Sequence, residues 1–449
     1  MRHEQVDRNL LTWPTALLAV IMLVGFLAAL VRFRYGLGVT TNLTDDWPWG
    51  LWKGFNVLVL IALGAGGFTS AALIYIFGGE RYHGLARSAV LWAILCYGFA
   101  GASLVVDISV PWRIVNPIYM WPYGSVLFEV AWCVILYLTV LALELAPSVF
   151  ERFGWSRLEE VWRKLVPVYA VAALTFFTYI MTHSVAWMAA AAVFFVFLAW
   201  FLPTVEHRSS TPVLLIMFGI ILSSLHQSSL GSLFLLVPEK LSHFWWSMRL
   251  PVTFLASAVA VGFAVIIIER TLSAWAFKRP VRDDLLQGVA GIAVVFLWGY
   301  IVIRALDVTA VAADAAAAGQ LALRFGGTAE AALFSTEMVL GFLLPAALLT
   351  SRKVRYHTAG RLTAALLLVG GVALNRLNVA FIGMNMEGTY VPSLIEVLIT
   401  VATVAAILFF YTLAVKLLPI YDAVDTAEEP TMDRPAEQVR GQRAPAEVV

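Results

Sequence analysis

The chain has 449 residues, of which 61% are hydrophobic and only 13% charged, and its formal net charge is +1. A soluble domain of this size would carry about twice that fraction of charged residues. The small net charge gives no basis for a nucleic-acid partner. Two cysteines, Cys96 and Cys133, are too few for a disulfide framework, a cysteine-rich zinc site or an iron–sulfur ligand set.

The apolar residues occur in runs near 20 residues long, which is the length that crosses a bilayer as a helix. We therefore expect an all-α integral membrane bundle of about twelve transmembrane helices within residues 1–421. Residues 422–449 are rich in Pro, Glu, Ala and Arg without an apolar period, which predicts a disordered cytoplasmic tail. The expected spans lie near 14–34, 53–77, 86–107, 122–145, 165–183, 185–203, 212–231, 248–269, 286–306, 329–350, 361–380 and 392–417.

The long apolar stretch 165–203 needs separate treatment, because it is too long for one straight crossing. A single helix over this stretch would be about 58 Å long at 1.5 Å per residue. The hydrocarbon core is only about 30 Å thick. A tight turn at His183 and Ser184 resolves the mismatch by making two short passes, a helical hairpin.

The distribution of lysine and arginine supports that hairpin and sets the orientation. With both termini in the cytoplasm, most of these residues fall in cytoplasmic segments, which is the usual positive-inside bias. A single pass over 165–203 would invert everything after it and place the later basic clusters outside. The clusters that decide this are Arg152, Arg157, Arg163 and Lys164; Lys278, Arg279 and Arg282; and Arg352, Lys353, Arg355 and Arg361.

Ionisable residues within the spans are candidate functional residues, because a charge in hydrocarbon costs several kcal/mol unless it is paired or hydrated. The topology places most of them towards the outer ends of helices, in a layer that contains both signs of charge. Interhelical ion pairs and a functional cavity both explain such a layer. The depth of Glu129, His226 and Glu337 favours a cavity for those three. The members of the layer are Asp107, Arg113, Glu129, His226, Gln227, Arg304, Asp307, Glu337, Arg376, Asn378 and Glu396.

A second, smaller set lies deeper or towards the cytoplasm. Tyr97 is in the middle of the third span, while Glu144 and Glu269 end the fourth and eighth spans. Together with Glu129 they suit a proton path, since carboxylates and tyrosines linked by water relay protons. The alternative is that Glu144 and Glu269 simply mark the water interface.

A haem is not expected in this chain. Membrane b-type haems usually need two facing histidines inside the bundle. Of the seven histidines only His226 is clearly within a span, and His183 is at a span end.

Several stretches resemble the NrfD/PsrC family of quinone-interacting membrane subunits. They are WPWGLWKGFNV at 47–57, SVLFEVAWCVILYL at 125–138, LELAPSVFERFGW at 143–155, LHQSSLGSLF at 225–234, VIIIER at 265–270, NRLNVAF at 375–381 and YVPSLIE at 390–396. The resemblance covers residues 12 to 420 and is nearest to the HybB-type membrane subunit of nickel–iron hydrogenases. Family members of this type typically have ten spans, so the stretch 165–203 resembles a hairpin inserted into a ten-helix core.

The resemblance implies a membrane protein of a prokaryotic inner (plasma) membrane that holds menaquinone or ubiquinone near the outer face. It also implies two partners, a ferredoxin-like iron–sulfur subunit on the outer face and a catalytic subunit of hydrogenase or molybdopterin type. By resemblance, Tyr97, Asp107, Glu129 and His226 handle the quinone and its protons. We further expect His226, Gln227, Arg304, Glu337, Arg376 and Glu396 to line the cavity, and Glu129, Glu144 and Glu269 to form the proton path.

A secondary transporter is the alternative from another class, because twelve spans and intramembrane carboxylates also suit that class. Transporters typically pair Gly/Pro-broken helices in matching halves, and the sequence lacks that pattern. The outward bias of the polar residues fits a quinone site next to an external partner better.

Overall fold

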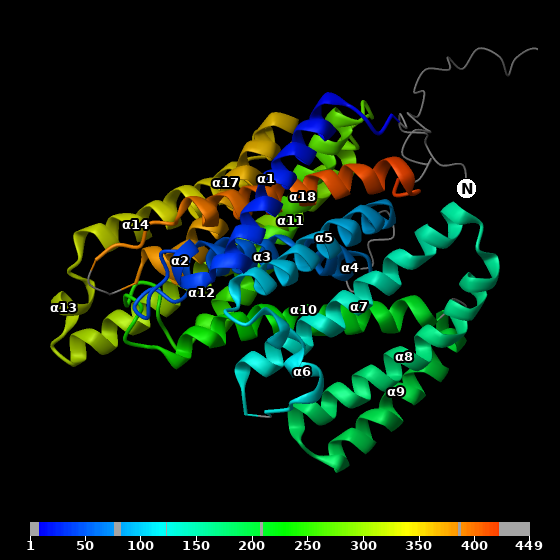
Figure 1. Cartoon of the computed structure of the whole chain (residues 1–449), viewed down its shortest axis with the longest axis horizontal. Coiled ribbons are helices and arrows are strands. Elements are labelled where there is room, and N and C mark those ends of the chain that lie inside the picture. The colour runs from blue at the N-terminus through cyan, green and yellow to red at the C-terminus, as the bar shows by residue number, and fades with distance from the viewer. Residues whose placement is uncertain (1–8, 76–81, 123, 207–209, 385–387, 422–449) are drawn as a thin grey trace, which may run out of the picture.

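The computed structural model describes residues 9–75, 82–122, 124–206, 210–384 and 388–421. Within these ranges the regular secondary structure is helical, and the one β contact is an isolated bridge between Leu241 and Met384 (Figure 1). The predicted tail 422–449 lies outside the described residues.

The helices follow one another with short connections. In chain order they are α1 (Trp13–Tyr35), α2 (Leu37–Thr40), η1 (Trp52–Val59), α3 (Leu60–Leu63), α4 (Gly66–Tyr75), α5 (His83–Asp107), η3 (Pro111–Val115), α6 (Asn116–Tyr119), α7 (Val126–Phe153), α8 (Ser156–Thr182), α9 (Val185–Glu206), α10 (Ser210–Ser232), η4 (Leu233–Leu236), α11 (Leu250–Ala276), α12 (Asp283–Ala317), α13 (Leu321–Phe325), α14 (Thr328–Met338), η5 (Val339–Leu343), α15 (Leu344–Thr350), α16 (Arg352–Arg355), α17 (Thr358–Leu377), η6 (Asn378–Ile382) and α18 (Leu394–Leu417).

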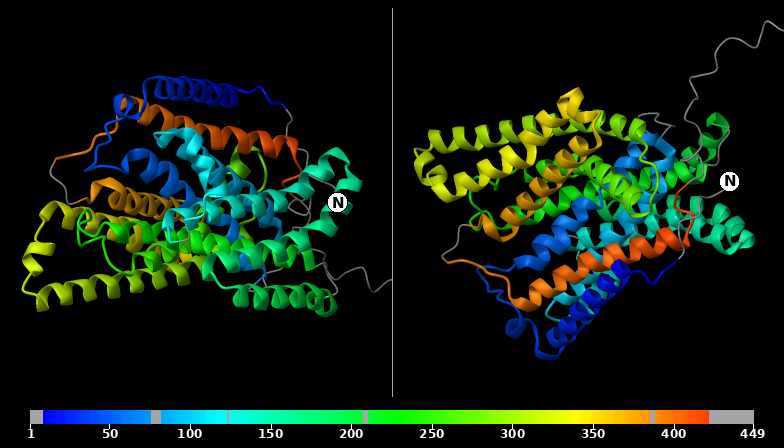
Figure 2. Two further views of the ribbon diagram at one scale, coloured as in Figure 1. Left: turned by 60° about the horizontal axis from the view of Figure 1, so that its bottom comes forward. Right: turned by 90° about the horizontal axis from the view of Figure 1, so that it is seen from above.

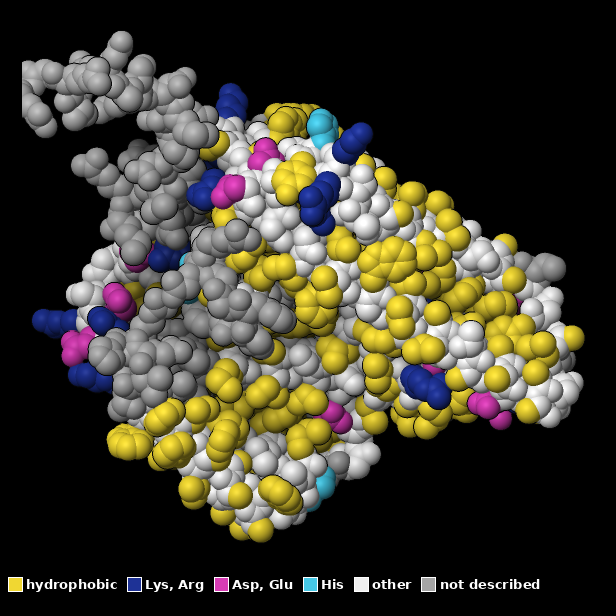
Figure 3. Space-filling view, turned by 180° about the vertical axis from the view of Figure 1, so that it is seen from behind, with side chains coloured by type: hydrophobic (Ala, Val, Ile, Leu, Met, Phe, Trp, Pro, Cys, Tyr) yellow, Lys and Arg dark blue, Asp and Glu magenta, His cyan; other side chains and the backbone are white. Residues whose placement is uncertain are grey.

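Eleven helical segments of the described chain are long and apolar enough to cross a membrane. The twelfth expected span corresponds to α9, whose apolar part Val185–Phe201 is shorter. Hydrophobic side chains cover much of the face seen in Figure 3, as a lipid-facing surface requires. The prediction of an all-α multi-pass membrane bundle is therefore confirmed, while the cytoplasmic placement of the two termini stays a prediction.

The stretch 165–203 folds as the expected hairpin. His183 ends α8 in the left-handed conformation, with φ 50°, and α9 begins two residues later at Val185. The α8 helix packs on α7 and α10, and α9 packs mainly on α8. The hairpin therefore covers one flank of the bundle without entering its centre (Figure 1).

The α12 helix is longer than its expected span 286–306. It has 35 residues, which makes it about 52 Å long at 1.5 Å per residue, against about 30 Å of hydrocarbon. Its last turns are rich in alanine, the residue with the highest helix propensity, so the helix continues beyond the apolar stretch. Together with α13 and the start of α14 it projects from one end of the molecule (Figure 1).

Two groups of helices surround the central α11. One group contains α4, α5, α7 and α10, and the other contains α12, α15 and α17. The first and last spans, α1 and α18, lie side by side along the bundle (Figure 2).

Three of the spans contain π-helical segments, namely η1, η5 and η6. Such segments are rare and often accompany functional sites, because the extra residue redirects side chains. Here Asn56 lies within η1, Glu337 lies two residues before η5, and Asn378 begins η6. The three segments thus place buried polar side chains inside the bundle.

Candidate functional site

The most unusual buried group is the imidazole of His226 on α10. Its side chain is fully buried, and neither ring nitrogen has a hydrogen-bond partner among the described residues. An unpaired polar group in such a place costs on the order of 1–3 kcal/mol. The arrangement therefore points to a ligand that hydrogen-bonds to this ring.

Tyr97 and Gln227 lie directly beside His226. The Tyr97 ring meets the imidazole edge to face, with centroids 5.4 Å apart, and its hydroxyl lies 3.1 Å from Ser223 Oγ. The Gln227 amide nitrogen donates to the Ile61 carbonyl at 2.8 Å and to the Tyr97 hydroxyl at 3.3 Å. Its amide oxygen has no partner among the described residues. Side chains from α5 and α10 and the backbone of α3 thus meet in one uncharged polar centre.

A glycine makes this meeting possible. Gly64 follows α3, and a Cβ placed there would lie 2.6 Å from two ring carbons of Tyr97. Real Cβ contacts are not that short, so any side chain at this position would push the tyrosine ring away. The second span therefore approaches Tyr97 closely because residue 64 lacks a side chain.

Glu129 lies in the first turn of α7, which packs on α10. The hydroxyl of Ser229 donates to Glu129 Oε1 at 2.7 Å, and Ser229 lies one turn after His226 on α10. Along α7, Cys133, Tyr137 and Glu144 follow at helical spacing. A Cβ on Gly219 of α10 would be 3.7 Å from Tyr137 and 3.8 Å from Glu144. The α7–α10 interface thus connects the His226 centre with the carboxylate at the other end.

A second buried centre surrounds Glu337 on α14. Its carboxylate is fully buried and accepts from Trp245 Nε1 at 2.7 Å, Asn375 Nδ2 at 2.8 Å and Asn378 Nδ2 at 2.8 Å. Arg376 donates to the Asn375 amide oxygen at 2.6 Å and to Ser257 Oγ at 2.8 Å. Three donors and a nearby guanidinium therefore satisfy this carboxylate completely.

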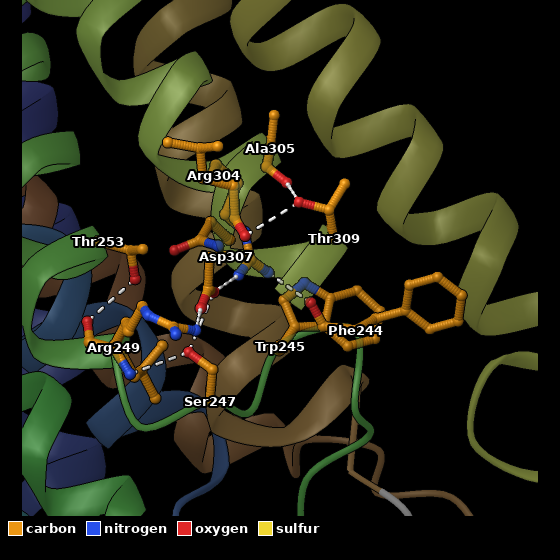
Figure 4. A network of polar contacts seen from close by, with 12 residues as sticks. Phe244, Trp245, Ser247, Arg249, Thr253, Arg304, Ala305, Asp307 and Thr309 are labelled. Atoms are coloured by element: carbon orange, nitrogen blue, oxygen red, sulfur yellow. Dashed lines mark hydrogen bonds and ion pairs between the residues drawn. The ribbon is translucent and has the colours of Figure 1, made fainter. Parts of the chain in front are cut away.

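Arg304 and Asp307 form an ion pair within α12, 2.8 Å apart and nearly fully buried. Ser247 donates to Asp307 at 3.0 Å, and Arg249 lies 3.5 Å from the same carboxylate. Arg304 also donates to the Phe244 carbonyl. Figure 4 shows these side chains converging on the loop that precedes α11. The same loop carries Trp245, which donates to Glu337. The pair thus anchors that loop at the base of the α12 projection.

Asp107 and Glu396 lie apart from His226. Asp107, at the end of α5, pairs with Lys53 at 3.0 Å, and it is ten residues from Tyr97, or about 15 Å along the helix. Glu396 belongs to the capping box of α18, where its carboxylate accepts from the Ser393 backbone at 2.8 Å. It also accepts from the Tyr390 hydroxyl, and burial together with this bond raises the pKa of Tyr390.

Glu269 on α11 is the centre of a further cluster at the opposite end of the bundle. Tyr411 donates to its carboxylate, Tyr421 does so at 3.1 Å and Ser88 at 3.1 Å. Burial, then the nearby Glu269 charge, raises the pKa of Tyr421. The four residues link α5, α11 and the end of α18.

Of the four residues expected to handle the quinone, Tyr97 and His226 are in contact. Glu129 on α7 is joined to α10 through Ser229, and Asp107 lies elsewhere. The expected cavity residues divide between separate clusters around Gln227, Glu337, Arg304 and Glu396. Sequence reasoning missed Ser223, Ser229 and Trp245 as partners of these polar side chains.

Metal and haem ligands are a separate question. Among the described residues, no group of three His, Cys, Asp or Glu side chains is placed to hold a metal ion. His183, the other histidine considered near a span, is exposed at the α8–α9 turn.

Comparison with known proteins extends over nearly the whole chain. A protein of Nitratidesulfovibrio vulgaris is 30% identical over 433 residues, covering 94% of this chain and 97% of the relative. The probable Ni/Fe-hydrogenase 2 b-type cytochrome subunit of Escherichia coli is 27% identical over 431 residues, 94% of this chain and 96% of the relative. The integral membrane subunit of menaquinone reductase from N. vulgaris is 39% identical over 127 residues, 28% of this chain and 30% of the relative. No protein-family model matches the chain.

The bundle of membrane spans with buried polar centres defines a polytopic membrane protein, and its named relatives are membrane subunits of redox complexes. The chain belongs to the NrfD/PsrC family and is HybB-like within it.

Proposed function

We propose that this chain is the quinone-reactive membrane subunit of a multi-subunit respiratory oxidoreductase. It passes electrons between an iron–sulfur partner subunit and the quinone pool of a prokaryotic inner membrane, with coupled proton transfer. The observation that carries the proposal is the fully buried His226 beside Tyr97 and Gln227, whose two ring nitrogens have no partner in the part of the chain that the structure describes. The names of the relatives support the same class of function.

The residues present fit a quinone head group. A quinone presents two carbonyl oxygens, which accept hydrogen bonds, and its reduced form presents two hydroxyls, which also donate. A neutral imidazole offers one donor and one acceptor. The amide oxygen of Gln227, which no described residue donates to, offers another acceptor. The centre carries no formal charge, which suits a neutral, apolar ligand.

Bound quinone would supply the two-electron, two-proton chemistry, and this chain's residues would position it and manage protons. His226 would hold one quinone oxygen through a ring nitrogen. The Tyr97 ring packs on the imidazole and fixes its orientation. Glu129, held by Ser229 Oγ, is the proton-exchanging carboxylate one turn along the helix pair.

Protons would travel between Glu129 and the opposite membrane face along the α7–α10 interface to Glu144. The cluster around Glu269 is a second station near that face, reached from α5 and α11. Glu337, Arg376, Arg304 and Glu396 act on the site through packing, because hydrogen bonds and ion pairs within the protein already occupy them.

The partners proposed are a ferredoxin-like iron–sulfur subunit and a catalytic subunit of hydrogenase or molybdopterin type. We propose that the chain itself carries no haem, although one relative is named a b-type cytochrome subunit. The relatives named as redox subunits do not favour the transporter alternative.

The test is quinone turnover and quinone retention in the native complex carrying His226→Leu or Glu129→Gln. Loss of a proton-transferring group typically costs 10²–10⁴-fold in rate, so we expect at least a hundredfold loss in both variants with the complex assembled. His226→Leu should also reduce the quinone that co-purifies, whereas Glu129→Gln should leave it unchanged. Glu239→Gln, on an exposed carboxylate, is the matched control. Normal turnover and normal quinone content in His226→Leu would refute this site.

A further inference from the structure

A row of buried hydroxyl groups leads away from the His226 centre in the direction of Glu144. The Gln227 amide nitrogen donates to the Tyr97 hydroxyl at 3.3 Å, and that hydroxyl lies 3.1 Å from Ser223 Oγ. Ser223 precedes Gln227 by one turn of α10, and both side chains are fully buried. The row therefore starts at the proposed quinone site and follows α10 back towards the start of that helix.

Tyr137 on α7 continues the row. Its side chain is 1% exposed, and its ring meets the Tyr97 ring edge to face, with centroids 4.6 Å apart. The Tyr137 hydroxyl interacts with Ser223 and with the charge of Glu144. It makes no well-formed hydrogen bond within the part of the chain that the structure describes. This hydroxyl can therefore turn towards a polar neighbour on either side, Ser223 or Glu144.

Gly219 marks the place where Tyr137 and Glu144 approach the same point of α10. A Cβ at this glycine would lie 3.7 Å from a ring carbon of Tyr137 and 3.8 Å from Glu144 Oε1. Glu144 follows Tyr137 by two turns of α7, so the two side chains lie on one face of that helix. The row thus ends at the carboxylate near the other end of the α7–α10 interface.

The second span covers the row from the other side. A Cβ on Gly64 would lie 2.6 Å from the Tyr97 ring, and a Cβ on Gly67 would lie 3.4 Å from the Tyr137 hydroxyl. The backbone of this span therefore packs directly against both tyrosines. Such close packing keeps lipid and bulk water away from the hydroxyls, so a proton on the row is not lost sideways.

We propose that Ser223 and Tyr137 relay protons between the His226 centre and Glu144. This inference rests on the proposed function, because it needs a quinone reaction at His226 that takes up or releases protons. Each hydroxyl accepts a proton on its oxygen as it passes its own proton on, so one proton moves along the row and neither hydroxyl keeps a charge. One bridging water closes the step between Tyr137 and Glu144. Ser223 and Tyr137 are thus relay residues that do not hold the quinone.

The test uses Ser223→Ala and Tyr137→Phe in the native complex, since each variant removes one hydroxyl and keeps most of the side-chain shape. Turnover should fall about tenfold or more, because a proton-transferring group is lost. The quinone that co-purifies should stay unchanged. Turnover should also slow more in D₂O than it does in wild type, because proton transfer then limits the rate.

The matched controls remove a hydroxyl elsewhere in the bundle. Thr403→Val removes one that is bonded to the Ile399 carbonyl on α18, and Tyr300→Phe removes a buried phenol on α12. Both should keep the turnover and the D₂O effect of wild type.

Three results would overturn the relay. The first is unchanged turnover in both relay variants while His226→Leu loses turnover. The second is lost turnover without a larger D₂O effect, which a merely structural role would give. The third is loss of co-purified quinone, which would make the hydroxyls ligands of the quinone. Failure of the proposed function itself is a different result, namely normal turnover and normal quinone content in His226→Leu.

Discussion

The two buried polar centres of this protein differ in how completely they are satisfied. Glu337 is a carboxylate that accepts three hydrogen bonds and lies near Arg376, so its burial is compensated within the protein. His226 is equally buried, yet both ring nitrogens lack a partner among the described residues. A satisfied centre stabilises the fold, whereas an unsatisfied one is a place where a ligand would gain most. The presence or absence of hydrogen-bond partners thus distinguishes a structural centre from a candidate ligand site better than the depth or the charge of the group does.

The largest effect expected from this comparison is at Glu337. Leucine at this position would leave the donors of Trp245, Asn375 and Asn378 buried without an acceptor. Breaking such a centre typically costs about 3–5 kcal/mol. We expect Glu337→Leu to accumulate poorly and to melt at a clearly lower temperature in detergent. Glu239→Leu, on an exposed carboxylate, is the control. A melting temperature indistinguishable from wild type would show that Glu337 does not stabilise the fold.

A smaller effect is expected where the second span meets Tyr97. Gly64→Ala would force the tyrosine ring away from a new Cβ, and overpacking of this kind costs about 1–3 kcal/mol. Because Tyr97 orients His226, quinone turnover should fall as well. Gly98→Ala is the matched control, since no described atom beyond the local helix backbone and the two chain neighbours lies within 4 Å of a Cβ placed there. If the two variants behaved alike, close packing at residue 64 would not matter for the site.

The smallest change in stability is expected at His226 itself. Leucine would remove two unsatisfied nitrogens from a buried position, and such a replacement is close to neutral or stabilising by up to about 1 kcal/mol. His226→Leu should therefore melt at or slightly above the wild-type temperature in quinone-free detergent, while losing turnover. A drop as large as that of Glu337→Leu would mean that His226 is a structural residue, and the contrast between the centres would fail.

The spans and the hairpin could be predicted from the sequence, because the length of an apolar run and the distribution of Lys and Arg are local properties that determine whether a segment crosses a bilayer. The partners of the polar residues did not follow. Trp245 and Glu337 are 92 residues apart, and no local pattern indicates that contact. Asp107 was expected in the quinone site with His226 because the family resemblance implies it. The structure places Asp107 about 15 Å along α5 from Tyr97, which contacts His226, and there it pairs with Lys53 instead.

Helix α12 was also underestimated, since its apolar run stops before its alanine-rich turns do. The apolar stretch predicted the membrane crossing, and the high helix propensity of the alanines that follow extends the helix beyond it. A hydropathy pattern therefore marks where a helix leaves the membrane, and it leaves open where the helix ends.

That extension has a geometric consequence for assembly. The last ten residues of α12 rise about 15 Å above the level of Asp307, and Arg304 and Asp307 brace the base of this projection against the loop before α11. The surface of the protein at this end is therefore stepped, not level. A soluble subunit that docks here must have a matching recess or must sit to one side of the step. The step thus limits the orientations in which such a subunit can approach this end.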